Sequence, residues 1–229
     1  MLPVFIIWLI RRYRQNQKKI RPGLSQVKKL KSRAAAILLP AIILLTANAS
    51  HGQAKLLNYT IMRNGSRVGT LRFSETVASG MDCLNMVSDV KTRFIFTFTA
   101  HAHEEAVYFN GVLLRSSIFR QLNGNEKANK QHQADNRQYI IHKGADTEIT
   151  RNFPITYNML SLYSREPEHV NQVYSDNFET FIAIQQAEPH KYKITLPDGN
   201  YNYYYYKNGV LNEIDVHHSL YSAQILLTN

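Results

Sequence analysis

The stretch of this sequence with the most chemical potential is His101-Ala102-His103-Glu104-Glu105. Successive side chains of a β-strand point to opposite faces, so His101, His103 and Glu105 would share one face, roughly 6–7 Å apart along the strand. Two imidazoles and a carboxylate are ligands that zinc and similar ions accept. The spacing therefore predicts a candidate metal site, and a metal-dependent enzyme built on it is one alternative. The competing interpretation is the solvent-facing side of a strand, where histidine and glutamate are ordinary.

A second unusual feature is the run of tyrosines near the C-terminal end. In a strand, Tyr201, Tyr203 and Tyr205 would lie on one face, and Tyr204 and Tyr206 on the other. Aromatic side chains suit a pleated surface, and their hydroxyl groups need partners when buried. Such a strand can be packed on both faces, or it can line a concave surface that binds a small amphipathic ligand. The candidate ligand-binding residues are Tyr201, Tyr203, Tyr204, Tyr205 and Tyr206, with Phe94, Phe96 and Phe98.

Other signatures of catalysis are weak. The chain has no Gly-x-Ser-x-Gly nucleophile elbow and no glycine-rich phosphate loop, so we predict no catalytic residues and no cofactor. Four acidic residues, Asp146, Glu148, Asp176 and Glu179, could pair as acid and base, but solvated loop carboxylates are commoner. Four histidines are expected at the surface, in loops or near strand ends: His132, His142, His169 and His190. The single cysteine, Cys83, is expected to be a small buried side chain inside a strand.

The elements that would position these residues are strands. From residue 93 to 105, apolar side chains alternate with polar ones, which predicts a half-buried strand that extends back towards Leu84. Turn pairs recur, and Asn-Gly favours tight hairpins between antiparallel neighbours. They are Asn64-Gly65, Ser79-Gly80, Asn110-Gly111, Asn123-Gly124, Lys143-Gly144, Asp198-Gly199 and Asn208-Gly209. We therefore predict an all-β fold, a strongly curved antiparallel meander or open barrel of about ten strands.

Two segments depart from this pattern. Residues 154–163 place apolar side chains at mixed spacings of three and four, and Glu166-Pro167 follows, which predicts one short helix covering an end of the sheet. Residues 123–136 are polar and are expected to form an exposed hairpin tip or loop.

The charge of the chain is concentrated at its start. Residues 1–52 contain ten basic and no acidic side chains, whereas the other 17 basic side chains balance the 17 acidic ones. Basic residues at 28–33, an apolar run at 34–47 and small residues up to Gly52 predict a cleaved signal peptide at 28–52. Residues 1–27 are interpreted as an extension or as a start site placed too far upstream. The predicted mature domain is residues 53–229, exported to the periplasm or cell envelope, with no nucleic-acid partner and no stable membrane span after cleavage.

Several local signatures, taken in order, resemble an uncharacterised exported bacterial family, domain of unknown function 6134. They are Tyr59-Thr60-Ile61 with Val68-Gly69, Phe109-Asn110-Gly111, Leu162-Tyr163 with Glu166-Pro167, Leu196-Pro197-Asp198-Gly199, and Tyr203 to Tyr206 with Asn208-Gly209. The resemblance implies a twisted antiparallel sheet and carries no catalytic or binding residue. We therefore predict a non-catalytic β-protein that binds a small amphipathic ligand or a cell-envelope component. The alternatives are the metal-dependent enzyme above and an outer-membrane β-barrel, for which eight strands of about ten residues would suffice.

Overall fold

The computed structural model describes residues 53–93, 97–219 and 221–228. The predicted extension and signal peptide, residues 1–52, and the candidate residues Phe94 and Phe96 lie outside the described part.

The described chain is almost entirely β-structure, with fourteen strands and one helix of a single turn. The strands are β1 (Gln53–Arg63), β2 (Ser66–Ala78), β3 (Met81–Arg93), β4 (Thr97–Phe109), β5 (Val112–Leu122), β6 (Asn125–Asp135), β7 (Gln138–Lys143), β8 (Asp146–Thr150), β9 (Gln172–Ser175), β10 (Thr180–Glu188), β11 (Lys191–Thr195), β12 (Tyr201–Lys207), β13 (Val210–His218) and β14 (Tyr221–Leu227). The helix is α2 (Ser161–Ser164). The predicted all-β class is confirmed, although the number of strands is larger than the ten expected.

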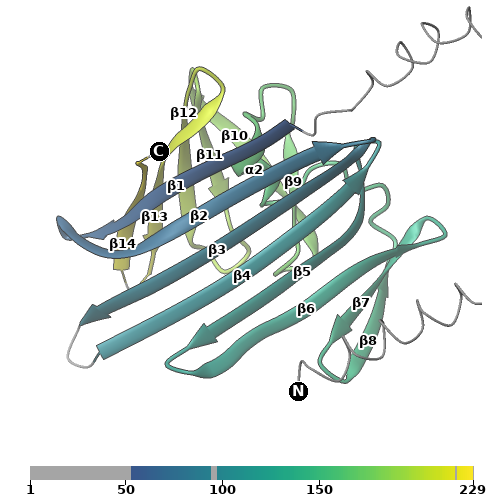
Figure 1. The fold of residues 1–229 in the computed structure, drawn as a ribbon, viewed down its shortest axis with the longest axis horizontal. Coiled ribbons are helices and arrows are strands. Elements are labelled where there is room, and N and C mark those ends of the chain that lie inside the picture. The colour runs from purple at the N-terminus through teal and green to yellow at the C-terminus, as the bar shows by residue number, and fades with distance from the viewer. Residues whose placement is uncertain (1–52, 94–96, 220, 229) are drawn as a thin grey trace, which may run out of the picture. The chain divides into compact units, whose positions relative to one another are not determined.

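All fourteen strands belong to one sheet in which every strand pairs antiparallel with its neighbours. The order runs β8 to β1 and continues through β14 to β9, so the first strand pairs with the last. The sheet is not closed, because β8 and β9 stand at its two ends. It folds back on itself, and β9–β14 lie behind β1–β6 in Figure 1. The open barrel-like meander predicted from the turn spacing is therefore present.

The turns explain why the antiparallel meander was predicted and why the predicted number of strands was too small. Asn64, Asn110, Asn123 and Asn208 all have left-handed backbone angles and are each followed by a left-handed glycine, as tight hairpins require. Three further reversals contain no glycine. In them the residues with left-handed backbone angles are Asn136-Arg137, Glu179 and His190. These reversals carry no Asn-Gly signal, so the strands around them were not separated in the sequence.

Two predicted segments need correction. The half-buried strand does not extend from Glu105 back to Leu84, because β3 ends at Arg93 and pairs antiparallel with β4, which begins at Thr97. Residues 123–136 are not a loop, since residues 125–135 form β6 between β5 and β7. The polar composition of β6 arises because many of its side chains are exposed, while its backbone pairs with β5 from Asn125 to Gln133 and with β7 from Lys130 to Asp135.

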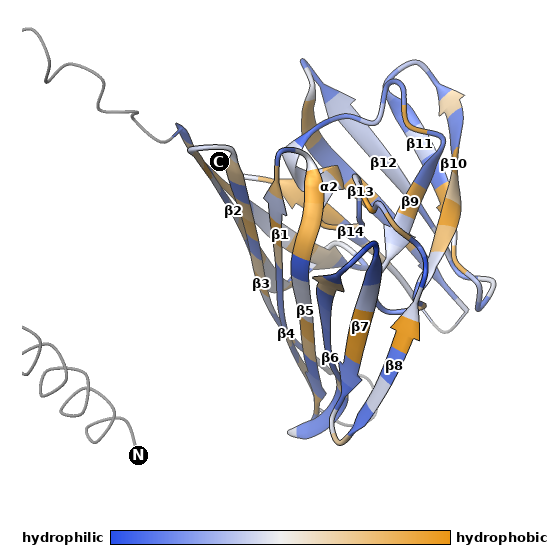
Figure 2. Cartoon of the chain, turned by 90° about the vertical axis from the view of Figure 1, so that its right-hand side faces the viewer, coloured by the Kyte–Doolittle hydropathy of each residue, from blue (hydrophilic) through white to orange (hydrophobic). Residues whose placement is uncertain are grey.

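The connection between β8 and β9 fills the interior of the folded sheet. It includes α2, which lies between the two halves of the sheet (Figures 1 and 2). Ile155 and Leu162 on this connection are fully buried, and Tyr206 of β12 donates a hydrogen bond to the Leu162 carbonyl (2.8 Å). From the other side, Tyr108 of β4 is hydrogen-bonded to Ser161 (2.9 Å). This connection, residues 151–171, is therefore hydrogen-bonded to both halves of the sheet, and we call it the plug.

The helix is shorter than the predicted 154–163. Before α2 the chain is extended: the Leu113 N–H donates to the Ile155 carbonyl, and Asn158 bridges to Tyr174 of β9. These contacts with β5 and β9 satisfy backbone groups that a helix would otherwise pair internally. The apolar side chains of 154–163 are nevertheless buried, as the prediction of a covering segment requires.

Candidate functional site

The tyrosines of β12 are divided between the two faces of the sheet, as the alternation predicted. Tyr204 and Tyr206 point into the core, whereas Tyr201, Tyr203 and Tyr205 lie on the outer face and are partly exposed. On that face the ring centroids of Tyr201 and Tyr203 are 5.8 Å apart, and those of Tyr203 and Tyr205 are 6.5 Å apart. We call these three rings the tyrosine ladder.

Neighbouring strands supply the ladder with polar and cationic groups. His217 of β13 stacks on Tyr201 at 4.6 Å, and Tyr205 donates a hydrogen bond to Asp215 (2.9 Å). From β11, the Lys193 ammonium lies 4.5 Å from the centroid of Tyr201 and 5.8 Å from that of Tyr203. A cation over an aromatic face is attracted by the ring quadrupole, so these contacts hold both the rings and the lysine in place.

Lys191 extends the same pattern along the ladder. Its ammonium lies 5.0 Å from the Tyr203 centroid and 5.2 Å from the Tyr205 centroid, and it pairs with Glu188 at 2.7 Å. The outer face of β11–β13 therefore presents apolar rings beside positive charges and hydrogen-bonding groups. Such a surface can bind a molecule that has both a hydrophobic face and charged or hydroxyl groups.

The inward-facing tyrosines are core residues. Tyr206 donates to the plug, and the hydroxyl of Tyr204 accepts a hydrogen bond from Asn202 (3.2 Å). Both rings belong to the main hydrophobic cluster, together with residues of the plug. Phe98, on the inner face of β4, is half-buried. The predicted candidates thus do not form one group, because Tyr204 and Tyr206 pack the interior while the ladder faces outward.

His101, His103 and Glu105 share the outer face of β4, as predicted, but each histidine has a local partner. His101 Nδ1 lies 2.8 Å from Asp89 on β3. His103 Nε2 lies 2.9 Å from the Asn85 side-chain nitrogen and 3.3 Å from Glu105. Cross-strand pairs of this kind are the usual stabilising contacts of a sheet surface.

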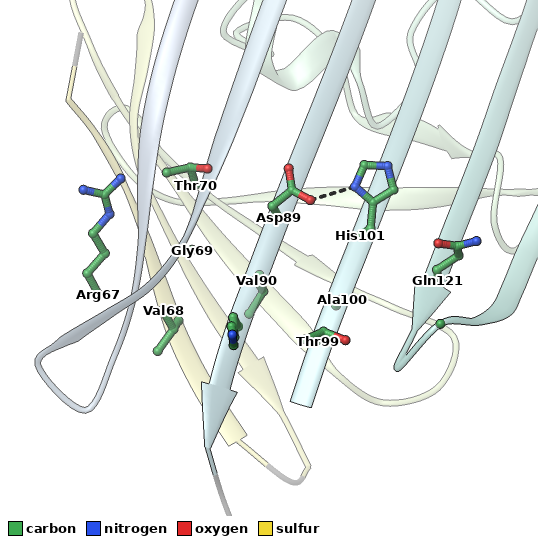
Figure 3. A pocket seen from close by; sticks show the side chains of 12 residues that line it. Arg67, Val68, Gly69, Thr70, Asp89, Val90, Thr99, Ala100, His101 and Gln121 are labelled. Atoms are coloured by element: carbon green, nitrogen blue, oxygen red, sulfur yellow. Dashed lines mark hydrogen bonds and ion pairs between the residues drawn. The ribbon is translucent and has the colours of Figure 1, made fainter. Parts of the chain in front are cut away.

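A hollow of about 630 Å³ lies next to His101 (Figure 3). Arg67, Thr70, Asp89 and Gln121 also line it, and the hydrogen bond between Asp89 and His101 crosses it. This hollow contains one of the three predicted metal ligands. His103 and Glu105 are not among the residues that line it.

A polar cluster that the sequence pattern did not predict lies inside the sheet. Ser116 of β5 and His132 of β6 are cross-strand partners, and both point inward. Ser116 Oγ donates to Asp176, which also accepts a hydrogen bond from Asn158 Nδ2 (2.9 Å). His132 Nδ1 lies 3.7 Å from the same carboxyl, and neither of its ring nitrogens has a hydrogen-bond partner among the described residues.

Burial sets the protonation of this cluster. Loss of solvent lowers the pKa of His132 to about 4, an effect that Glu179 opposes. Loss of solvent raises the pKa of Asp176 to about 6, although the hydrogen bond from Ser116 opposes it. Both shifts act toward the neutral form, so His132 is neutral above about pH 4 and Asp176 is neutral below about pH 6. His132 was expected at the surface, and this prediction is wrong because its neighbours in β6 are polar and conceal that it occupies an inward position.

Cys83 and the remaining acidic candidates do not gather at one site, although two of the acidic residues share a lysine. Cys83 is in a strand, as predicted, but it is exposed rather than buried. It lies opposite Thr76 and Val107 on the outer face, since the inward positions of β3 are Leu84 and Met86. Among the four acidic candidates, Glu148 and Glu179 share Lys143 as an ion-pair partner, at 2.7 and 2.8 Å.

Comparisons with known proteins place the fold. A model of the family described as "Domain of unknown function (DUF6134)" matches residues 59–228. The crystal structure of a "Beta-barrel-like Protein of Domain of Unknown Function DUF1849 from Brucella abortus" aligns with a TM-score of 0.50 over 78% of this chain and 96% of that chain, at 8% identity. At this identity the likeness shows the fold alone. A search of curated proteins finds no match.

None of the helices in the described residues is long and apolar enough to cross a membrane.

Proposed function

This chain belongs to the DUF6134 family, and from that premise we propose that it is an exported, non-catalytic protein that binds an acidic saccharide of the cell envelope through the tyrosine ladder. The observation that carries the proposal is the ladder itself, three outward rings with the ammonium groups of Lys191 and Lys193 over them.

The position of the ladder supports binding from outside the sheet. The plug and the inward tyrosines occupy the interior beside β12, so a ligand there would have to displace buried apolar side chains. The outer face requires no such displacement. Export is supported by residues 28–52, which have the features of a signal peptide and precede the family match that starts at Tyr59.

The chemistry of the ladder favours a saccharide with negative charge. Aromatic rings contact the apolar faces of sugar rings, and the hydroxyl of Tyr205 and the imidazole of His217 offer hydrogen bonds. The Lys193 ammonium lies over two rings, where it can meet an anionic group on the same ligand. The ladder thus combines the two features that an acidic sugar would need.

The test is binding by the purified protein to lipopolysaccharide and to peptidoglycan sacculi, with dextran as the neutral saccharide. We expect lipopolysaccharide to slow the migration of the protein in a native gel, or the protein to sediment with sacculi. Dextran should change the migration of the protein little. Tyr203→Ala and Lys193→Met should each weaken binding about tenfold, since each removes a contact worth about 1–2 kcal/mol.

Phe109→Ala is the matched control, because Phe109 is an exposed aromatic residue at the turn between β4 and β5. It should bind as the unchanged protein does. Equal binding by the Tyr203→Ala variant, or failure of the unchanged protein to bind either acidic probe, would reject the proposal.

A further inference from the structure

Away from the tyrosine ladder, two carboxylates and an imidazole converge beside the exit of α2. They belong to Glu166, Glu168 and His190. Within the described part of the chain, this is the group of three whose potential ligand atoms all lie within 4.8 Å of one another. The group is distinct from His101, His103 and Glu105, which the sequence suggested for metal binding.

The fold fixes where these three residues lie. Glu166 and Glu168 flank the buried Pro167 in the segment that leads from α2 to β9. His190 is in the turn between β10 and β11, where its backbone is left-handed (φ 60°). Its carbonyl accepts a hydrogen bond from the Tyr206 N–H (2.9 Å), which ties the turn to β12. Glu166 contacts both His190 and Tyr192, so the two segments lie side by side although they are distant in sequence.

Glu166 is the unusual member of the group. Its side chain is only 4% exposed. One carboxylate oxygen, Oε1, lies 2.9 Å from His190 Nδ1 and accepts a hydrogen bond from the Tyr192 hydroxyl (2.8 Å). The other, Oε2, is buried and has no hydrogen-bond partner among the described residues. A buried carboxylate oxygen without a partner is costly, and a bound cation would remove that cost.

We propose that Glu166, Glu168 and His190 bind a divalent transition-metal ion, zinc being the one whose chemistry fits best. Zinc accepts a mixture of imidazole nitrogen and carboxylate oxygen, and three protein ligands leave a fourth position for water. Its bond lengths place tetrahedral ligand atoms about 3.4 Å apart. His190 (61% exposed) and Glu168 are surface side chains, so they can move the short distance that this geometry requires.

The ion would act as a clip. Glu166 and Glu168 belong to the connection that supplies the plug, whereas His190 belongs to the sheet. A metal bridging them would fasten the end of the plug segment to the β10–β11 turn, close to the open edge formed by β9. The expected role of the ion is structural. An ion that binds only the folded state raises the free energy of unfolding.

The experiment uses the full chain, produced without a histidine tag, stripped with a chelator and dialysed against zinc chloride in a buffer that does not bind zinc. We expect one tightly bound zinc ion per chain by elemental analysis, and a melting temperature that rises with zinc concentration. His190→Gly removes the imidazole and tolerates the left-handed backbone. It should weaken zinc binding by at least about tenfold, since even second-shell changes at metal sites cost that much.

Matched controls separate this site from adventitious binding. His169→Gly removes an exposed histidine of the same segment, and Glu188→Gln removes an exposed carboxylate at the same turn, so both should bind zinc as the unchanged protein does. Glu168→Gln should bind more weakly. Full zinc binding by the His190→Gly variant, or loss of binding in a variant lacking His101 and His103, would overturn the proposal.

Discussion

His132 Nδ1 lies 3.7 Å from the Asp176 carboxyl oxygen inside the sheet. Between about pH 4 and pH 6 both side chains are neutral in the folded protein. Their effects on stability have opposite signs. As the pH falls from 6.5 to about 4, the unfolded chain protonates His132 while the folded protein does not, so stability falls. Between pH 6 and 3.8, the folded protein protonates Asp176 before the unfolded chain does, so stability rises as the pH falls. The two effects should largely cancel.

Asp176→Asn is expected to expose the histidine effect. The amide cannot titrate, so the variant should lose stability relative to the unchanged protein by up to about 1.4 kcal/mol per pH unit between pH 6 and 4. Urea unfolding at pH 7, 6, 5 and 4.5 measures it. The cost of the amide itself adds the same stability difference at every pH. If the difference between the two proteins did not change with pH across this range, the prediction would be contradicted.

At the residue scale, sequence alternation was enough to assign faces but not functions. It placed Tyr201, Tyr203 and Tyr205 together, and it placed His101 and His103 together. It could not show that Tyr204 and Tyr206 meet the plug, because that contact depends on how a distant connection folds. For the same reason, it did not bring His190 to Glu166, since residues 24 positions apart meet only through the β10–β11 turn.

At the element scale, Gly69 determines how closely β2 and β3 approach. A Cβ on Gly69 would lie 2.3 Å from the Asp89 carbonyl oxygen and 3.0 Å from the Val90 Cα. Between the pairs Ile61–Gly69 and Met62–Arg67, Val68 has no partner on β1, so a bulge bends β2 at the same place. The bend and the close approach together let the long strands curve around the core.

Gly69→Ala should therefore destabilise the protein by about 1–3 kcal/mol, because the obstructing atoms are backbone and cannot move aside cheaply. Chemical unfolding of the variant and the unchanged protein gives the difference. Gly124→Asn is the control: nothing lies within 4 Å of its Cβ position, and asparagine tolerates the left-handed backbone. It should change stability by less than about 0.5 kcal/mol. Similar losses in both variants would show that close approach at Gly69 is not the cause.

The elements were predictable where a local signal marked their ends. Asn-Gly pairs located most hairpins, because the left-handed backbone of a two-residue turn selects these residues. β6 was missed because its polar side chains gave no alternation, and its pairing is set by β5 and β7. The helix was overextended because its apolar spacing reflects burial in the core, which the extended residues of the plug share.

At the scale of the whole molecule, the sheet depends on β14 as a central strand. Ile225 pairs with Ile61 of β1 on one side and with Ile214 of β13 on the other. A proline at this position removes the N–H and disrupts a strand that has neighbours on both sides. We expect Ile225→Pro to destabilise the protein by at least about 3 kcal/mol, measured as a lower urea midpoint or as loss of soluble protein.

Ile149→Pro makes the same change in β8, which stands at an end of the sheet and where this isoleucine is 62% exposed. An edge strand tolerates proline better, so this variant should remain folded. If both variants unfolded alike, β14 would not be the joint between the two halves of the sheet.

The pairing of β1 with β14 also orders events in time. Among the described strands, β1 is synthesised first and its partner β14 is synthesised last. The two strands pair with Tyr59 opposite Leu227. Contacts between such distant residues form slowly, because a long loop must close before they can stabilise the fold. The pairing that joins the two halves of the sheet therefore cannot form until β14 has been made. A protein that must be threaded through a membrane before it folds would gain from this delay.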